Sequence, residues 1–251
     1  MFVLGIVGSG RKNGRTAELM EAVLGGAEAQ GARTQQIYLA DYDLRYHMGV
    51  AAEGAPYCPE ALADLCEEAE AIVLGSPVYY GDINGLTRSF MDSVPLPNAN
   101  GKPALGFAIA GGSGKGLLSG VQSIYHFFYH RQMRAIDPTP VSRFNMEAAR
   151  ISLRESGAAL VDRFDTVAPF PGEARSDRWA DVLAYYASLP YFTAGPVDEF
   201  VMLAEQLIRI SKGPEVAQAK ATLGQALDLI REGDPSRAAP YAVRAYEMLY
   251  F

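Results

Sequence analysis

Apolar residues fall into short runs along the first 141 residues, separated by amphipathic stretches. The first run, residues 2–7, is nearly all hydrophobic, as in a strand covered on both faces. The helix after it, from about residue 14 to 31, has an apolar side, and a further amphipathic helix is expected from about residue 117 to 134. The full set of expected strands is 2–7, 33–39, 71–75, 104–110 and 135–141. Since strands alternate with helices, we predict an α/β fold with a parallel, doubly wound sheet.

Beyond residue 144 the pattern becomes helical. A segment at 165–175 contains Pro169, Pro171 and Gly172 and is typical of a linker or an ordered loop. We therefore predict a sheet domain over 1–165 and a helical extension over 176–251. The expected helices are 145–163, 176–189, 197–211, 214–231 and 235–249.

Two helix starts and one hairpin can be predicted within this extension. Ser176-Asp177 and Asp234-Pro235 suit helix starts, by capping and by proline in the first turn. The last two helices are similar to a hairpin of a repeat protein, but such arrays usually need three or more units. We expect an appendage that packs on the sheet domain or on another subunit.

Composition excludes some partners. The chain has 22 basic and 29 acidic residues, a net charge of −7 and no long charge run, so no nucleic-acid surface is indicated. No apolar run approaches the roughly 20 residues that span a bilayer. Met1 leads directly into the first strand without a basic leader, and only Cys58 and Cys66 are present. We expect a cytoplasmic protein with no membrane partner.

Three loops leave the carboxyl ends of predicted strands, at residues 8–16, 76–85 and 111–116. In an open parallel sheet, ligands bind beyond these ends, near the point where the strand order switches. All three loops are rich in glycine, hydroxyl groups or aromatic rings. Together they predict one site with three walls.

Neither of the two common nucleotide-binding motifs is present in these loops. In the dinucleotide pattern GxGxxG the third glycine should stand at position 13, but Asn13 is there and Gly14 comes one place late. The triphosphate pattern GxxxxGK[ST] fails in the third loop, where Gly116 follows Lys115. A single phosphate group fits better, held by Ser9, Thr16, Arg11 and backbone N–H groups at the helix start. The alternative is that the two hydroxyls only cap the helix.

The second loop places aromatic residues at the end of a buried strand. Pro77 is followed by Tyr79 and Tyr80, on which a flat ring could stack. Backbone groups of an irregular turn could bind the polar edge of that ring. The alternative is that both tyrosines are half-buried packing residues.

Taken in order, GSGRKNGRTAEL, GSPVYYGDINGLTRSFMDS and AGGSGKG resemble the NADPH-dependent FMN reductase and iron–sulfur flavoprotein branch of the flavodoxin-like superfamily. The resemblance covers residues 1 to about 140. It implies a flavodoxin-like five-stranded sheet in the order 2-1-3-4-5, and noncovalent FMN. It also implies which residues bind FMN. Those at the phosphate are Ser9, Arg11, Asn13, Gly14, Arg15 and Thr16. Those flanking the isoalloxazine are Pro77, Val78, Tyr79, Tyr80 and Gly81, with Gly111, Gly112 and Ser113 at its other edge.

The chain departs from this family pattern at two places. Iron–sulfur flavoproteins carry a compact cysteine run before the second helix, whereas residues 46–58 contain Cys58 alone. A cluster normally needs four thiolates. Cys58 and Cys66 cannot supply them, so we predict no iron–sulfur cluster. Asp92-Ser93 also replaces the family's usual Asp-Arg.

The resemblance implies an FMN-dependent oxidoreductase. A nicotinamide, NADPH or NADH, would reduce the flavin, which would pass electrons to a small-molecule or protein acceptor. No catalytic acid or base is required, and Tyr80 and Asp82 are the residues expected nearest the reacting edge, although Asp82 could equally be a turn residue. The alternatives are an electron carrier without its own substrate and a scaffold that has lost flavin. The family also implies a homodimer or homotetramer, for which the tail aromatics offer contact surface unless they cover their own subunit.

Two further features carry weaker signals. His126 and His130 stand four apart on a predicted helix, a spacing that can bind a metal, but no third ligand is evident. We predict no metal site. Cys58 could be a reactive thiol, and an inert buried cysteine is the favoured interpretation.

Overall fold

A computed structural model describes residues 1–45, 58–166 and 168–251 of the chain. Its sheet contains the parallel strands in the order β2-β1-β3-β5-β6, with a short β4 paired antiparallel to β3. The strands are β1 (Phe2–Val7), β2 (Arg33–Tyr38), β3 (Ala71–Tyr79), β4 (Asp82–Ile83), β5 (Pro103–Ala110) and β6 (Arg134–Ser142). The predicted fold class and strand order are confirmed.

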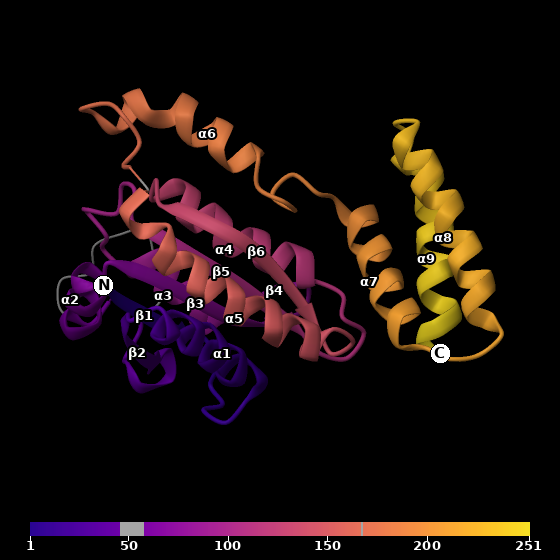
Figure 1. The fold of residues 1–251 in the computed structure, drawn as a ribbon, viewed down its shortest axis with the longest axis horizontal. Coiled ribbons are helices and arrows are strands. Elements are labelled where there is room, and N and C mark those ends of the chain that lie inside the picture. The colour runs from indigo at the N-terminus through magenta and orange to yellow at the C-terminus, as the bar shows by residue number, and fades with distance from the viewer. Residues whose placement is uncertain (46–57, 167) are drawn as a thin grey trace.

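Helices cover both faces of this sheet (Figure 1). One face packs against α2 (Glu60–Glu68), α3 (Gly85–Ser93) and α4 (Leu117–His130). The other face packs against α1 (Arg15–Ala29) and α5 (Met146–Asp162). β1 serves both cores, because successive side chains of a strand point to opposite faces. Phe2, Leu4 and Ile6 therefore face one core, while Val3 and Val7 face the other.

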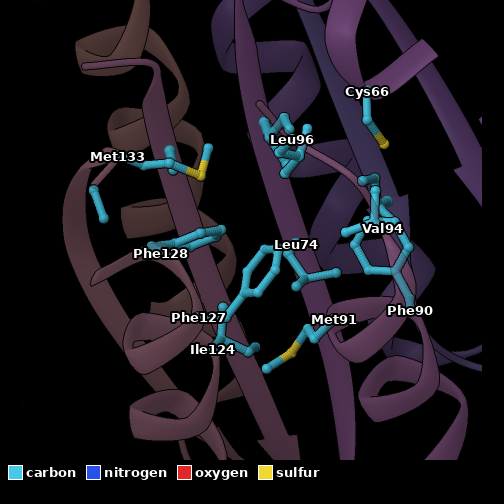
Figure 2. Packing of buried hydrophobic residues seen from close by; sticks show 14 of the residues in the cluster. Cys66, Leu74, Phe90, Met91, Val94, Leu96, Ile124, Phe127, Phe128 and Met133 are labelled. Carbon is cyan, nitrogen blue, oxygen red and sulfur yellow. The ribbon is translucent and has the colours of Figure 1, made fainter. Parts of the chain in front are cut away.

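The first core is rich in aromatic and sulfur-containing side chains, as Figure 2 shows. Phe90 and Met91 of α3 face Phe127 and Phe128 of α4, all of them buried. The ring centroids of Phe90 and Phe127 lie 6.3 Å apart at a tilt. This packing fixes α3 against α4, and thereby the two loops that precede these helices.

The C-terminal helices continue from the sheet region. Short 3-10 turns, η2 (Phe164–Thr166) and η3 (Arg175–Arg178), lead into α6 (Trp179–Ala187). The hydroxyl of Tyr186 on α6 donates to the Met133 carbonyl at 2.9 Å, and that of Tyr185 donates to the Ala135 carbonyl at 2.7 Å. Both tyrosines therefore cover their own subunit's sheet.

The last three helices form a bundle beside the carboxyl edge of the sheet (Figure 1). They are α7 (Pro196–Ile210), α8 (Glu215–Arg231) and α9 (Pro235–Tyr250). Leu203 of α7 and Tyr246 of α9 share an apolar cluster with Ala110 and Leu117, where β5 ends and α4 begins. The extension thus packs on the sheet region at the end where ligands of such sheets bind. Among the described helices, none is long and apolar enough to cross a bilayer.

Three sequence predictions need correction. The buried strand predicted to stop at residue 75 continues to Tyr79, because β4 pairs with its end. The helix predicted from residue 117 to 134 stops at His130, since Gln132 adopts a φ of 57° and turns the chain into β6. The start predicted at Ser176-Asp177 is wrong for the α-helix, as this segment forms the 3-10 turn η3.

One predicted helix start is confirmed, and one segment of the chain lies outside the described residues. The Asp234 carboxylate accepts the Arg237 N–H at 3.1 Å and so caps α9 as predicted. Residues 46–57, most of the segment compared above with the cysteine run of iron–sulfur flavoproteins, lie outside the described residues.

Candidate functional site

The first loop follows β1 and ends at Gly14, the N-cap of α1. The Ser9 hydroxyl accepts the Arg11 N–H at 3.1 Å, which closes a tight turn. No side chain caps α1, so the interpretation of Ser9 and Thr16 as simple helix caps is wrong. In the described part of the chain, the N–H groups of residues 12–16 donate to no acceptor. These free donors at a helix N-terminus are the arrangement that binds a phosphate.

The loop's cations differ in their partners. Lys12 pairs with Asp41 at 2.6 Å, and Arg15 pairs with Glu18 at 2.8 Å. Arg11 is exposed and forms no ion pair with any described residue. Of the predicted phosphate ligands, Arg11 is therefore the cation that can bind an anion without breaking an existing pair.

The second loop is a hairpin. Tyr79 pairs with Asp82, so Tyr80 and Gly81 form a two-residue turn. Both adopt positive φ, 52° and 89°, as the type I′ turns of hairpins require. Tyr79 is 57% exposed and Tyr80 is fully exposed, which rules out the half-buried packing interpretation. The hairpin therefore exposes two tyrosine side chains to solvent.

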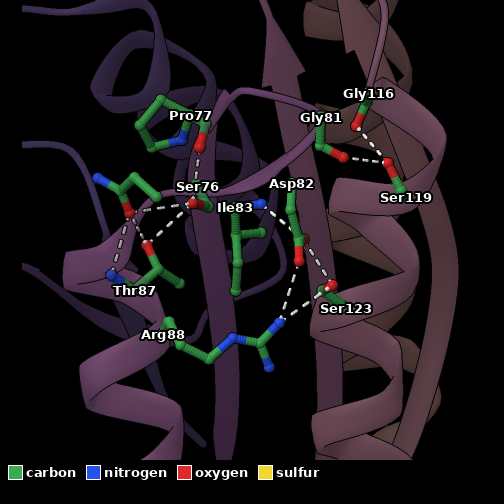
Figure 3. Close-up of polar contacts among 11 residues, drawn as sticks. Ser76, Pro77, Gly81, Asp82, Ile83, Thr87, Arg88, Gly116, Ser119 and Ser123 are labelled. Carbon is green, nitrogen blue, oxygen red and sulfur yellow. Dashed lines mark hydrogen bonds and ion pairs between the residues drawn. The ribbon is translucent and has the colours of Figure 1, made fainter.

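A buried polar network joins this hairpin to the first loop, and Figure 3 shows the part of it around Ser76 and Thr87. Asn84, the N-cap of α3, donates to the Gly8 carbonyl at 2.7 Å. Its side-chain oxygen accepts the Thr87 N–H at 3.0 Å and the Thr87 hydroxyl at 2.7 Å. The hydroxyls of Ser76 and Thr87 lie 2.9 Å apart. Since the Gly8 N–H also donates to the Gly75 carbonyl at 2.8 Å, the two loops are held together from inside the sheet region.

Sequence reasoning missed Asn84 and Thr87. An asparagine directly before a helix is a capping signal. That signal predicts the bond to Thr87 but not the one to Gly8, which lies 76 positions away.

The third loop touches the hairpin through its backbone. Gly112, Gly114 and Gly116 all adopt positive φ. A Cβ on Gly116 would lie 2.5 Å from the Gly81 Cα, so only glycine allows this approach. The hydroxyl of Ser119, one turn into α4, also bonds to the Gly81 carbonyl. All three predicted walls are therefore in contact, although Gly111 and Gly112 themselves remain exposed.

Two C-terminal side chains hold the third loop. Glu199 of α7 accepts the Gly116 N–H at 2.9 Å through one carboxylate oxygen and the Leu118 N–H at 3.0 Å through the other. A carboxylate at this position satisfies the free donors of α4 and complements its helix dipole. The Tyr246 hydroxyl donates to the Ser113 carbonyl at 2.9 Å. Nothing in the sequence pattern indicated these contacts.

The Asp82 side chain contacts α3 and α4. Its carboxylate accepts the Ser123 hydroxyl at 2.6 Å, its neighbour's Ile83 N–H at 2.7 Å and the Arg88 guanidinium at 3.2 Å (Figure 3). These contacts fix the base of the hairpin against α3 and α4. A catalytic role for Asp82 or Tyr80 stays a prediction.

The described cysteines and histidines, in residues 1–45, 58–166 and 168–251, do not belong to any cluster of three or more metal-ligating side chains. Burial raises the pKa of the Cys58 thiol to about 11 and that of Cys66 to about 12. Both residues are buried in the core, which favours the inert interpretation of Cys58.

The sheet order and the three joined loops define a flavodoxin-like α/β protein. Solved structures share this fold. A flavodoxin from the domain Archaea aligns with a TM-score of 0.50 and 21% identity, over 66% of this chain and 99% of the other. An NADH:FMN oxidoreductase in its apo form aligns with a TM-score of 0.51 and 21% identity, over 70% and 93%.

The chain belongs to the NADPH-dependent FMN reductase family, whose family model matches residues 1–144. An iron–sulfur flavoprotein of Methanocaldococcus jannaschii is 33% identical over an alignment of 154 residues that covers 55% of this chain and 79% of that protein. An iron–sulfur flavoprotein of Archaeoglobus fulgidus is 28% identical over 127 residues, 46% of this chain and 57% of that relative. Family membership makes the protein an FMN-dependent oxidoreductase. Residues 145–251 lie outside the family match.

Proposed function

We propose that the protein uses NADPH or NADH to reduce a small-molecule or protein acceptor through noncovalently bound FMN. The observation that carries this proposal is the set of unpaired N–H donors at residues 12–16, a few residues from Arg11 and joined to a hairpin with two exposed tyrosines. A phosphate and a flat ring are the two parts of FMN that such walls would bind. The residues present therefore fit the cofactor that the family name implies.

Each part of the site has a distinct task in this proposal. The N–H groups of the first loop, the Ser9 and Thr16 hydroxyls and Arg11 would hold the phosphate. Tyr79 and Tyr80 would flank the ring and exclude water from one side of it. The third loop, at Gly111 to Ser113, would bound the other edge. Bound FMN supplies the redox chemistry, and the protein supplies position and electrostatics.

This proposal needs no acid or base from the protein. Asp82 is already bonded to Arg88 and Ser123, so its contribution would be to hold the hairpin in shape. Tyr80, which is fully exposed, would be the residue nearest an incoming nicotinamide or acceptor.

We propose that the protein works without an iron–sulfur cluster, although its relatives from Methanocaldococcus jannaschii and Archaeoglobus fulgidus are named iron–sulfur flavoproteins. The whole sequence has two cysteines, whereas such a cluster normally takes four thiolates. Burial raises the pKa of both thiols, which works against the thiolate form that binds iron. Assembly as a homodimer or homotetramer in the cytoplasm remains part of the proposal.

The visible absorption spectrum tests the proposal directly. We expect the protein to take up FMN, and the flavin band near 450 nm to bleach on addition of NADPH or NADH and recover with a quinone acceptor. Uptake of FMN without bleaching by either nicotinamide would contradict the reductase activity and favour an electron carrier. A protein that takes up no FMN would contradict both functions.

A further inference from the structure

A second concave site lies between α3, α4 and the turn η3, and its lining includes Arg88, which bonds to Asp82. It encloses a cavity of about 470 Å³. Its walls carry three arginines, Arg88, Arg131 and Arg175, together with His126 and His130. The chain as a whole is acidic, with a net charge of −7. The positive charge in this cavity is therefore a local concentration.

Two of the three arginines, Arg131 and Arg175, have no anionic partner among the described residues, whereas Arg88 pairs with Asp82 at 3.2 Å. Arg131 donates to the Val94 carbonyl at 2.7 Å, and Arg175 bonds to the His130 carbonyl. Neither forms an ion pair with any carboxylate of the described residues. Asp92 is the acidic residue of the lining, and it too forms no ion pair there.

Burial and neighbouring positive groups lower the pKa values of two side chains of this cavity. Burial and the nearby Arg175 both lower the pKa of Arg131. Burial, His130 and Arg88 lower the pKa of His126. Positive groups that are partly desolvated and close together are stabilised by an anion placed between them.

The remaining lining suits a small phosphorylated molecule. Phe127 and Met91 supply apolar surface next to the charged groups. The Arg131 guanidinium lies 5.5 Å from the centre of the Phe127 ring, which restricts its orientation. Arginine forks match phosphate oxygens in geometry and can bind them in pairs.

We propose that this cavity binds the phosphate group of a small phosphorylated molecule, with Arg131 and Arg175 as its principal charge partners. Arg88 and Ser123 link the cavity to the hairpin, because both also bond to Asp82 (Figure 3). The phosphate could belong to the nicotinamide dinucleotide or to a separate metabolite. The first of these sources rests on the proposed function, whereas the binding site itself does not.

The test uses inorganic pyrophosphate and FMN-saturated protein at constant ionic strength, so that the first loop is already filled. Binding is followed by the NMR signals of the His126 and His130 rings. We expect saturable shifts, and we expect Arg131→Gln and Arg175→Gln each to weaken binding about tenfold, the effect of losing one charge-assisted hydrogen bond. Arg231→Gln, an exposed arginine on α8 outside the cavity, is the matched control and should bind as the wild type does.

A response that does not saturate, or that is equal in all three variants, would overturn the proposal. Arg131 donates to the Val94 carbonyl and Arg175 bonds to the His130 carbonyl, so thermal unfolding of both variants checks that each remains folded.

Competition then identifies the source of the phosphate. If NADPH displaces pyrophosphate and Arg175→Gln raises KM for NADPH, the ligand is the dinucleotide. If pyrophosphate binds but NADPH does not compete, the site takes a separate phosphorylated molecule. Failure of the proposed function would appear separately, as no FMN uptake, and the comparison of Arg175→Gln with Arg231→Gln would still report on the cavity.

Discussion

The first and third loops of the candidate site are held in different ways. The first loop is fixed from within the sheet region, by Gly75, Asn84 and Thr87. The third loop is fixed by Glu199 and Tyr246, two residues of the C-terminal helices that lie outside the range matched by the family model. The comparison shows that the helical extension is part of the site's support, whereas the residues that would touch FMN all lie in the family-matched part.

The largest effect is expected where the third loop touches the hairpin. Gly116→Ala puts a Cβ 2.5 Å from the Gly81 Cα at a φ of 89°. Strain and overpacking together should lower the free energy of unfolding by about 3 kcal/mol, measured by urea denaturation. FMN affinity should fall with it. Gly224→Ala, on α8 and outside the candidate site, is the control, because a Cβ there meets nothing within 4 Å; an equal loss of stability and of FMN affinity in both variants would contradict this account.

The next effect concerns the inner support of the first loop. Asn84→Ala removes the cap of α3 and the donor to the Gly8 carbonyl, so the free energy of unfolding should fall by about 2 kcal/mol. Asp234→Ala removes the cap of α9 and an exposed ion pair with Arg237, and should cost about 1 kcal/mol. Calorimetric titration should show weaker FMN binding for Asn84→Ala alone. Equal FMN affinity in the two variants would show that the polar network around Asn84 does not support FMN binding.

A smaller effect is expected for the outer support. Glu199→Gln removes a charge from the N-terminus of α4 and replaces one acceptor oxygen by an amide, which should cost about 1.5 kcal/mol of stability. Glu205→Gln, on the exposed side of the same helix, should cost under about 0.5 kcal/mol. Thermal unfolding of both variants measures the difference, and no difference would show that Glu199 does not hold the loop.

The smallest effect depends on pH. Burial raises the pKa of Tyr246 to about 12, from an ordinary value of 10.0. The stability that its neutral hydroxyl contributes is therefore complete below pH 10 and is lost as pH rises towards 12. Between pH 9 and 11, the urea midpoint of the wild type should fall slightly more than that of Tyr246→Phe. Parallel curves would exclude a role for this hydroxyl.

The sequence predicted the sheet and its three loops better than it predicted the contacts of the C-terminal helices with the third loop. Runs such as residues 2–7 and 104–110 are buried on both faces, and their positions before glycine-rich loops indicate the three walls. The hairpin at Tyr80 was missed because its turn, Tyr-Gly, lacks the Asn-Gly or Asp-Gly signal of two-residue hairpins.

The contacts of Glu199 could not be predicted from the pattern. This residue lies 83 positions from Gly116, and an acidic residue in the first turn of α7 has a sufficient local explanation in its own helix dipole. Such tertiary bonds carry no periodic signal along the chain. The same holds for the cavity at Arg131 and Arg175, whose members come from separate elements.

The central claim is that the C-terminal helices hold one wall of an FMN site. The measurement that tests it most directly is the FMN dissociation constant of the double variant Glu199→Gln, Tyr246→Phe, compared with Glu205→Gln by titration of the flavin absorbance. Because the double variant loosens the third loop while leaving every predicted FMN contact in place, its dissociation constant should rise about tenfold. An unchanged dissociation constant in a folded double variant would contradict the claim.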